Sequence, residues 1–153
     1  MTIKHNYFAY GSNMLTERIL DRLGTVEQVG IGLLPNYQLV FNRLGSYSPG
    51  GVASVIPSQG RSVYGVIWKL NNKQLTMLDE IEDPAAYSRE SVSVEMNDGS
   101  SVDCLTYIAY SQGYHPPTKN YLSYLIRGAE EHDLPSKYVK NLRRRSVRAE
   151  VVN

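Results

Sequence analysis

Residues 7–23 read YFAYGSNMLTERILDRL and change character halfway along. The apolar run at the start indicates a short strand over His5 to Ala9, and the leucine and isoleucine spacing after it predicts a helix over Leu15 to Leu23. The chain therefore passes from a strand through a glycine turn directly into a helix. Ser12 or Asn13 is expected to cap that helix, because short polar side chains accept hydrogen bonds from the free N–H groups of a first turn.

Beyond this stretch, short apolar runs alternate with turn residues. Proline and glycine separate most of the runs, and Asp98-Gly99 is typical of a hairpin turn. Strands are expected over Val26–Leu34, Tyr37–Arg43, Val52–Ile56, Ser62–Leu70, Ser91–Met96 and Val102–Tyr110.

A second helix is predicted over Asn72 to Glu82. Asn71, followed three residues later by Gln74, has the form of a capping box, and Pro84 should end the helix at about the preceding residue. Further helical stretches are expected over Lys119–Glu131 and shortly after Leu134-Pro135.

Strand runs outnumber helices, and most neighbouring runs are joined by short turns. This pattern predicts an α+β fold whose mixed, largely antiparallel sheet forms a small β-barrel with flanking helices, rather than a doubly wound α/β fold. A length of 153 residues predicts one domain over residues 1–153, with about 145–153 as a less ordered or extended tail.

The charge balance argues against a nucleic-acid or membrane partner, because the formal net charge is only +1. The run Arg143 to Arg145, with Arg148, is interpreted as a solvated helix end. No apolar run has the length of a secretion signal or approaches the roughly 20 residues of a membrane span. With Cys104 as the only cysteine, we expect a cytoplasmic protein.

The turn Tyr10-Gly11-Ser12-Asn13 is the first candidate site. N–H groups at the start of a helix lack intrahelical partners and favour negative charge, and Gly11 lets a ligand approach the backbone closely. Such a turn can hold a carboxylate, a phosphate or a developing oxyanion. A plain capped turn is the alternative interpretation.

The acidic string over residues 79–83 is the second candidate site. At about 100° per residue, Glu82 falls on the apolar side of its helix, Glu80 on the opposite side and Asp79 at the boundary. Burial at the end of an apolar stripe would raise the pKa of Glu82 toward the range that suits proton transfer. The alternative is that the helix frays and leaves Glu82 in water.

Other reactive residue types give weaker signals. His5, His115 and His132 lie far apart with no spacing of a metal site, so no metal is expected. Cys104 lies in an apolar strand pattern and is interpreted as a small buried hydrophobe. No phosphate-binding glycine motif appears, so no nucleotide cofactor is expected. The chain holds 12 Tyr against two Phe and one Trp, which suits either the edge of a core or an aromatic pocket for a polar ligand.

The string YFAYGSNM over residues 7–14 resembles the N-terminal signature of the γ-glutamylcyclotransferase family, a superfamily that includes AIG2-like and γ-glutamylamine cyclotransferase-like proteins. The resemblance continues through most of the chain. It covers Gly50–Ala53, Val63–Lys69, Leu78–Glu82 and Pro116-Pro117 before Tyr121.

The resemblance implies a reaction in which a γ-glutamyl amino acid or amine cyclises to 5-oxoproline and releases its amine, as in glutathione metabolism. It implies Glu82 as the catalytic general base and acid, and residues 10–13 as the substrate-binding loop. It also implies Tyr87, Tyr107 and Tyr121 as pocket residues, with neither a metal nor an organic cofactor. Several members of the family are dimers, so a homodimer is compatible with the resemblance.

Two segments depart from the family pattern and leave the substrate open. Residues 83–86 are one residue shorter than in the animal enzymes, and the stretch from Asn42 to Pro49 looks distinct; both are expected to border the pocket. The alternatives are a γ-glutamylamine cyclotransferase, a tailoring enzyme for a larger substrate, and a non-catalytic module that binds γ-glutamyl ligands.

Overall fold

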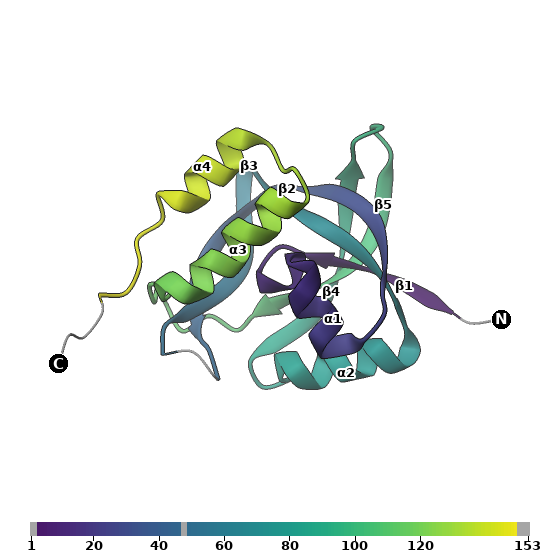
Figure 1. Ribbon diagram of the computed structural model, residues 1–153, viewed down its shortest axis with the longest axis horizontal. Helices are drawn as coiled ribbons and strands as arrows, with labels where there is room; N and C mark the ends of the chain where they lie inside the picture. Colours follow the sequence, from purple (N-terminus) through teal and green to yellow (C-terminus); the bar gives the residue numbers. More distant parts are fainter. Residues whose placement is uncertain (1–2, 47–48, 150–153) are drawn as a thin grey trace.

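The computed structural model describes residues 3–46 and 49–149. Five strands close into a barrel in the order β1-β3-β2-β4-β5, and helices pack around it (Figure 1). The strands are β1 Lys4–Ala9, β2 Glu27–Leu44, β3 Gly51–Asn71, β4 Tyr87–Met96 and β5 Ser101–Ala109. The helices are the 3-10 turn η1 Ser12–Met14, α1 Thr16–Leu23, α2 Asn72–Glu82, α3 Lys119–Glu131 and α4 Ser136–Arg143.

Every strand pair in the barrel is antiparallel except β1 with β5, which are parallel. The predicted α+β fold with a mixed, largely antiparallel barrel is therefore confirmed. In Figure 1, α3 and α4 lie across one side of the barrel, while α2 lies along its lower edge. No helix within the described residues is long and apolar enough to cross a membrane.

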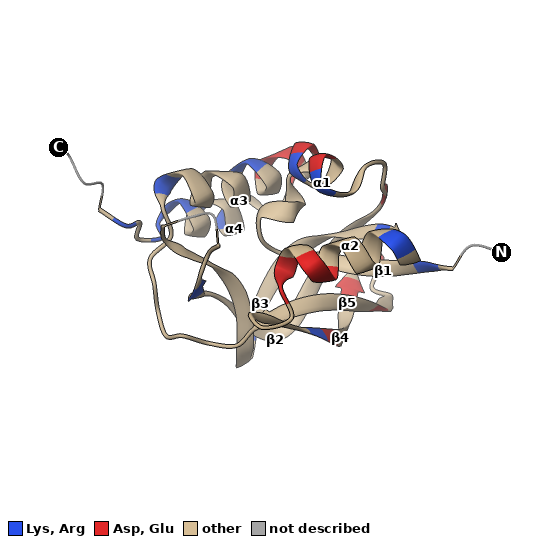
Figure 2. Cartoon of the chain, turned by 90° about the horizontal axis from the view of Figure 1, so that it is seen from below, with Lys and Arg blue, Asp and Glu red and all other residues tan. Residues whose placement is uncertain are grey.

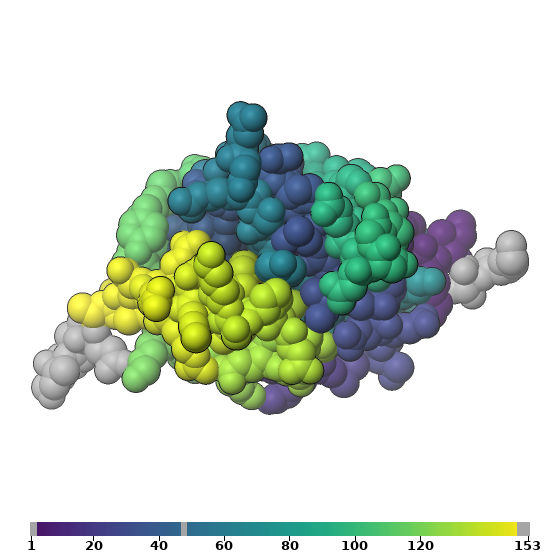
Figure 3. Space-filling view, turned by 90° about the horizontal axis from the view of Figure 1, so that it is seen from above, coloured from purple at the N-terminus to yellow at the C-terminus, as the bar shows by residue number. Residues whose placement is uncertain are grey.

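Strands β2 and β3 are each continuous, so the predicted breaks at Pro35 and Gly60 are wrong. The two strands pair along nearly their whole length, with shifts of register that include one between Pro35 and Tyr37. A bulge tolerates a proline because the missing N–H falls where the ladder is already interrupted. Opposite this bulge, the Gly60 N–H donates to Asn36 Oδ1 at 3.1 Å. The tip of this pair near residue 60 stands out from the surface in Figure 3.

Strand β4 begins at Tyr87, four residues before the predicted start at Ser91. The extra rungs pair with β5, and Tyr87 lies opposite Ala109. This longer ladder brings Tyr87 into the barrel wall beside the end of α2.

The capping prediction for the first helix is wrong. Ser12 and Asn13 belong to η1. Helix α1 begins at Thr16, and its N-cap residue, Leu15, makes no side-chain capping hydrogen bond. Instead, the Thr16 N–H donates to Glu131 Oε1 of α3 at 2.8 Å. A free N–H of α1 is thus satisfied by a distant helix rather than by a local cap.

Helix α2 follows the sequence closely. The predicted capping box is confirmed, because Asn71 Oδ1 accepts the Gln74 N–H at 2.8 Å and Gln74 Oε1 accepts the Asn71 N–H at 3.0 Å. The helix ends at Glu82, and Asp83 turns the chain away with a φ of 67°.

Close packing fixes α3 against the glycine turn. A Cβ on Gly128 would lie 2.8 Å from Met14 Cβ and 2.9 Å from the Leu15 nitrogen, so only glycine fits there. Met14 and Leu125 are fully buried in the resulting core. The turn is therefore held between the barrel and α3.

The arginine-rich segment packs on the body of the protein. Arg145 donates to the Leu39 carbonyl at 2.7 Å, and the Arg148 N–H donates to the Pro117 carbonyl at 2.7 Å. The Arg148 guanidinium also donates to the Pro49 carbonyl, so side-chain contacts within the protein occupy two of the arginines that could have met nucleic acid. Residues 150–153 of the expected tail lie outside the described residues.

We expect Asn71→Ala to lower the free energy of unfolding by about 1 kcal/mol, because the N-cap acceptor is lost. Urea denaturation measures the change. Lys73→Ala, an exposed change in the same helix, is the control and should stay within about 0.5 kcal/mol of the parent. Equal stability of the two variants would contradict the capping role.

Candidate functional site

A cavity of about 580 Å³ opens between the barrel, α1, the end of α2 and α3. The structure brings all of the residues proposed from the sequence to its wall. They are Tyr10, Gly11, Ser12, Asn13, Glu82, Tyr87, Tyr107 and Tyr121. The glycine turn and Glu82 at the end of the acidic helix therefore face one space, although Asn13 and Glu82 lie 69 residues apart in sequence.

The glycine turn is fixed by side chains from three directions. The Trp68 indole donates to the Asn13 carbonyl at 3.0 Å, and Asn13 Nδ2 donates to the Tyr7 hydroxyl at 3.1 Å. Arg22 donates to Asn13 Oδ1 at 3.3 Å, and Arg18 Nε donates to Ser12 Oγ at 2.9 Å. The polar side chains of the turn therefore build the cavity wall instead of capping α1.

This arrangement corrects one step of the sequence argument. The anion-binding interpretation relied on the N-terminus of a helix starting directly after the turn, but Ser12 and Asn13 are themselves part of η1, and α1 begins only at Thr16. The anion-binding capacity that remains comes from η1 itself, because the Ser12 and Asn13 N–H groups are the first of this helical turn and have no partner within it.

Glu82 is the last residue of α2 and lines the cavity. Burial raises the pKa of Glu82, and the positive charges of Arg22 and Arg18 oppose that rise. Glu80 is exposed, as helical phase predicts. Figure 2 shows the acidic residues gathered at one end of α2.

Asp79 has a different role from Glu82. Its carboxylate accepts the Tyr107 hydroxyl at 2.6 Å and forms an ion pair with Arg89 at 2.7 Å. Asp79 thus orients Tyr107 from outside the cavity, in agreement with its predicted position at the boundary of the helix face.

The cavity tyrosines are held through their hydroxyls. Tyr87 donates to the Ala53 carbonyl at 3.0 Å, and the Tyr121 oxygen accepts the Ala53 N–H at 3.0 Å. Burial raises the pKa of Tyr121 to about 12 and the pKa values of Tyr87 and Tyr107 further above their ordinary value. All three phenols are therefore neutral near pH 7.

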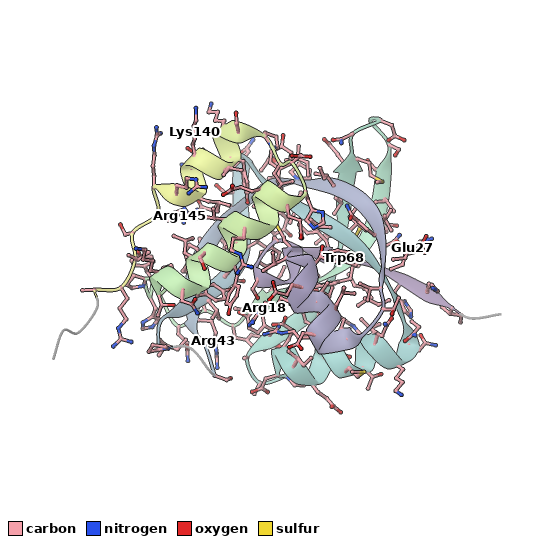
Figure 4. All side chains as sticks on the ribbon, in the orientation of Figure 1. Arg18, Glu27, Arg43, Trp68, Lys140 and Arg145 are labelled. Atoms are coloured by element: carbon pink, nitrogen blue, oxygen red, sulfur yellow. The ribbon has the colours of Figure 1, made fainter. Side chains whose placement is uncertain are left out.

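Several residues of the cavity wall escaped the sequence analysis. Arg18 and Arg22 lie four residues apart on α1, next to its apolar stripe, and Arg43 lies near the end of β2. Arg18 also lies over the Tyr124 ring, 4.6 Å from its centroid. Figure 4 labels Arg18 and Arg43. The i, i+4 spacing beside the turn was a usable signal for the first pair; nothing local marks Arg43.

Both departing segments border the cavity, as expected. Arg43, Leu44 and Pro49 line it from one segment, and Ala86 lines it from the other.

The remaining reactive residues stay apart. Within the described residues, no three His, Cys, Asp or Glu side chains come together as a metal site would require. His132 packs against Trp68 with 5.6 Å between ring centroids, and His5 meets Asn72. Cys104 is buried in β5, where burial raises the pKa of its thiol to about 12, so it is a poor nucleophile.

Comparison of the sequence and the fold with known proteins identifies the family. The sequence pattern of the AIG2-like family matches residues 62–142. Human γ-glutamylcyclotransferase is 36% identical over 143 residues, which cover 90% of this chain and 76% of the human protein. A solved γ-glutamyl cyclotransferase superposes with a TM-score of 0.94 at 30% identity, over 99% of this chain and 93% of that one. The crystal structure of YkqA from Bacillus subtilis superposes with a TM-score of 0.78 at 26% identity, over 92% of this chain and 53% of that one.

The fold and these relatives identify the protein as an enzyme of the γ-glutamylcyclotransferase type. The chain belongs to the AIG2-like γ-glutamylcyclotransferase family.

Because the pKa of Glu82 is higher in the folded protein than the value of about 4.3 of a free glutamate, the native state holds this proton more tightly. Stability then falls as the pH rises through the window above about 4.3. We expect Glu82→Gln to be more stable than the parent at pH 7, with the difference shrinking as the pH falls toward 4. Denaturant midpoints across this range measure it.

Glu80→Gln is the matched control, since Glu80 is exposed two residues earlier in the same helix. It should show no such pH-dependent gain. A Glu82→Gln variant that tracks the parent at every pH would show that the carboxylate is solvated.

Proposed function

We propose that this enzyme converts a γ-glutamyl amino acid or amine to 5-oxoproline and releases the free amine, with Glu82 as general base and then general acid. The observation that carries the proposal is that Glu82 is the one carboxylate among the described residues of the cavity wall. The names of its relatives support the same reaction type.

Glu82 is also the wall residue best suited to exchange a proton near neutrality. Within the described residues, the wall holds no histidine, cysteine or lysine. Its buried tyrosines titrate far above neutral pH, and its arginines stay protonated. A carboxylate whose pKa is raised by burial comes closest to the working pH, where a base and acid is most effective.

The proton steps balance within one active site. Glu82 takes a proton from the substrate α-ammonium, and the freed amine attacks the γ-carbonyl of the same molecule. Glu82 returns this proton to the leaving nitrogen as the tetrahedral intermediate collapses and the bond to that nitrogen breaks. The new ring nitrogen then loses its second proton through Glu82, and the released amine takes it up, so that a neutral lactam and an ammonium ion are formed. Well-oriented intramolecular attack reaches effective molarities of about 10⁵ M or more, so holding the substrate's conformation supplies much of the rate.

Donors on the glycine turn would stabilise the oxyanion. Ser12 and Asn13 line the cavity, and the Tyr121 oxygen lies 3.6 Å from the position of a Cβ on Gly11. Because Tyr121 accepts the Ala53 N–H, its own proton is available for a ligand. A side chain on Gly11 would project into this space.

The other tyrosines would orient the substrate amine. Tyr87 donates to the Ala53 carbonyl and Tyr107 donates to Asp79, so each phenol oxygen has acceptor capacity left for an ammonium group. Arg18 and Arg22 add positive charge beside Glu82, where the α-carboxylate of the glutamyl group would lie.

We expect Glu82→Gln to lower kcat by about 10²–10⁴-fold, because the amide keeps the shape of the side chain and removes the base. Release of 5-oxoproline from a γ-glutamyl amino acid measures the loss. Glu80→Gln should keep parental turnover. Full turnover by Glu82→Gln on an accepted substrate would contradict the assignment.

We also expect Arg22→Gln to move the acidic limb of the kcat/KM profile to higher pH. Arg22 favours the ionised form of Glu82, so its removal raises the pKa at which the base is lost. A pH–rate profile on one substrate gives the shift, with Arg127→Gln as a control on exposed charge. An unchanged or lowered midpoint would show that Arg22 does not act on the catalytic base.

A substrate panel separates the remaining possibilities. γ-Glutamyl amino acids, γ-glutamyl amines and larger γ-glutamylated molecules are each assayed for 5-oxoproline. Binding of 5-oxoproline by calorimetry, with no turnover across the panel, would instead identify a non-catalytic module. The cytoplasmic location is expected from the sequence alone, and a homodimer is compatible with the family resemblance; analytical ultracentrifugation tests the assembly.

A further inference from the structure

The cavity wall carries more positive charge than its own acid can balance. Three arginines and one carboxylate line it, which gives 3 − 1 = +2 with Glu82 ionised. Among the described residues, none of the three arginines has a carboxylate within 4.0 Å. Their hydrogen-bond acceptors are neutral: Ser12 for Arg18, Asn13 for Arg22 and the Tyr110 carbonyl for Arg43. Partly buried cations without anionic partners favour an anionic ligand.

These positive charges act on two different parts of the cavity. Burial raises the pKa of Glu82, and Arg22 and Arg18 oppose it. Burial, the neighbouring Tyr121 and Tyr7 phenols and the Glu82 carboxylate raise the pKa of the Tyr87 hydroxyl, and Arg43 opposes that rise. Arg18 and Arg22 come from α1, whereas Arg43 comes from the end of β2 (Figure 4). The cavity therefore offers one anion position near Glu82 and a second one toward Tyr87.

Apart from Arg43, the part of the wall at the second position is uncharged, and it reaches the protein surface. After Arg43 the lining continues with Leu44, Gly45 and Ser46, and the Leu44 side chain is exposed. Among the described residues, Arg43 makes one side-chain hydrogen bond, from Nη1 to the Tyr110 carbonyl at 3.1 Å, and its guanidinium carries further N–H donors that can meet a ligand.

We propose that Arg43 binds the carboxylate of the leaving amino acid and so makes the enzyme selective for γ-glutamyl amino acids over γ-glutamyl amines. This inference rests on the proposed cyclisation. A γ-glutamyl amino acid carries two carboxylates, one on each side of the scissile bond, and a γ-glutamyl amine carries only the first. The two anion positions match the former. The glutamyl carboxylate lies with Arg18 and Arg22, and the leaving carboxylate lies with Arg43 near the open end, from which the product departs.

The test compares three substrates that differ only at the leaving group: γ-glutamyl-alanine, its carboxamide and γ-glutamyl-ethylamine. We expect the parent enzyme to prefer γ-glutamyl-alanine by about tenfold or more in kcat/KM, as a hydrogen bond to a charged group allows. Arg43→Gln should remove this preference, mainly through KM, and leave the other two substrates within about twofold. Arg43→Lys should restore part of it, because the charge returns without the forked geometry.

Arg61→Gln is the matched control, since Arg61 is an exposed arginine on β3 whose side chain meets only Gln38 among the described residues. It should behave as the parent enzyme does. Equal kcat/KM values for the three substrates in the parent, or an equal loss on all three in Arg43→Gln, would overturn the assignment of Arg43 while the cyclisation stands. Failure of the parent to release 5-oxoproline from any substrate would instead remove the proposed function, and the role of Arg43 with it.

Discussion

The hydrogen bond from the Trp68 indole to the Asn13 carbonyl ties the glycine turn to the barrel, and the cavity depends on it. Trp68 lies opposite Tyr7 in the antiparallel ladder of β1 and β3, so its position is set by the sheet rather than by a loop. Both rings are buried. From the other side, Gly128 lets α3 press directly on Met14. The turn is therefore clamped between two rigid elements, which is the support that a precise binding wall requires.

Burial and positive charge act in opposition on Glu82. Desolvation favours the neutral carboxyl, whereas Arg22 and Arg18 favour the carboxylate. The surrounding tyrosines contribute dipoles without titrating near neutrality, because burial raises their pKa values. Proton exchange is thus concentrated on one carboxylate among neutral tyrosines, and the arginines of the wall tune how readily that carboxylate ionises.

Local patterns predicted what local forces decide. The capping box of Asn71 and Gln74 involves residues three apart, and the helical phase that separates Glu82 from Glu80 needs only one turn of α2. The cap of the first helix was mispredicted, because Ser12 and Asn13 bond to Arg18, Arg22 and Tyr7 instead of to their own helix. The tyrosines of the wall meet at the Ala53 backbone, which lies 34 residues from Tyr87 and 68 from Tyr121. Barrel closure creates such meetings, and no periodicity in the sequence encodes them. Arg43 escaped notice for the same reason, since only the folded barrel turns it toward Tyr87.

The bent β2–β3 pair ends at the mouth of the cavity, where Leu44 lies opposite Gly51 on the last rung of the ladder. The turn and Glu82 are anchored elsewhere, by β1, α2 and α3. On this last rung Gly51 is fixed, since a Cβ there would overlap the His115 carbonyl oxygen, but the exposed Leu44 can be exchanged without disturbing the barrel core or the proton-transferring carboxylate. Substitutions at this rim can therefore change which substrates are accepted while the reaction stays the same. Sequence differences among relatives are expected to accumulate there first.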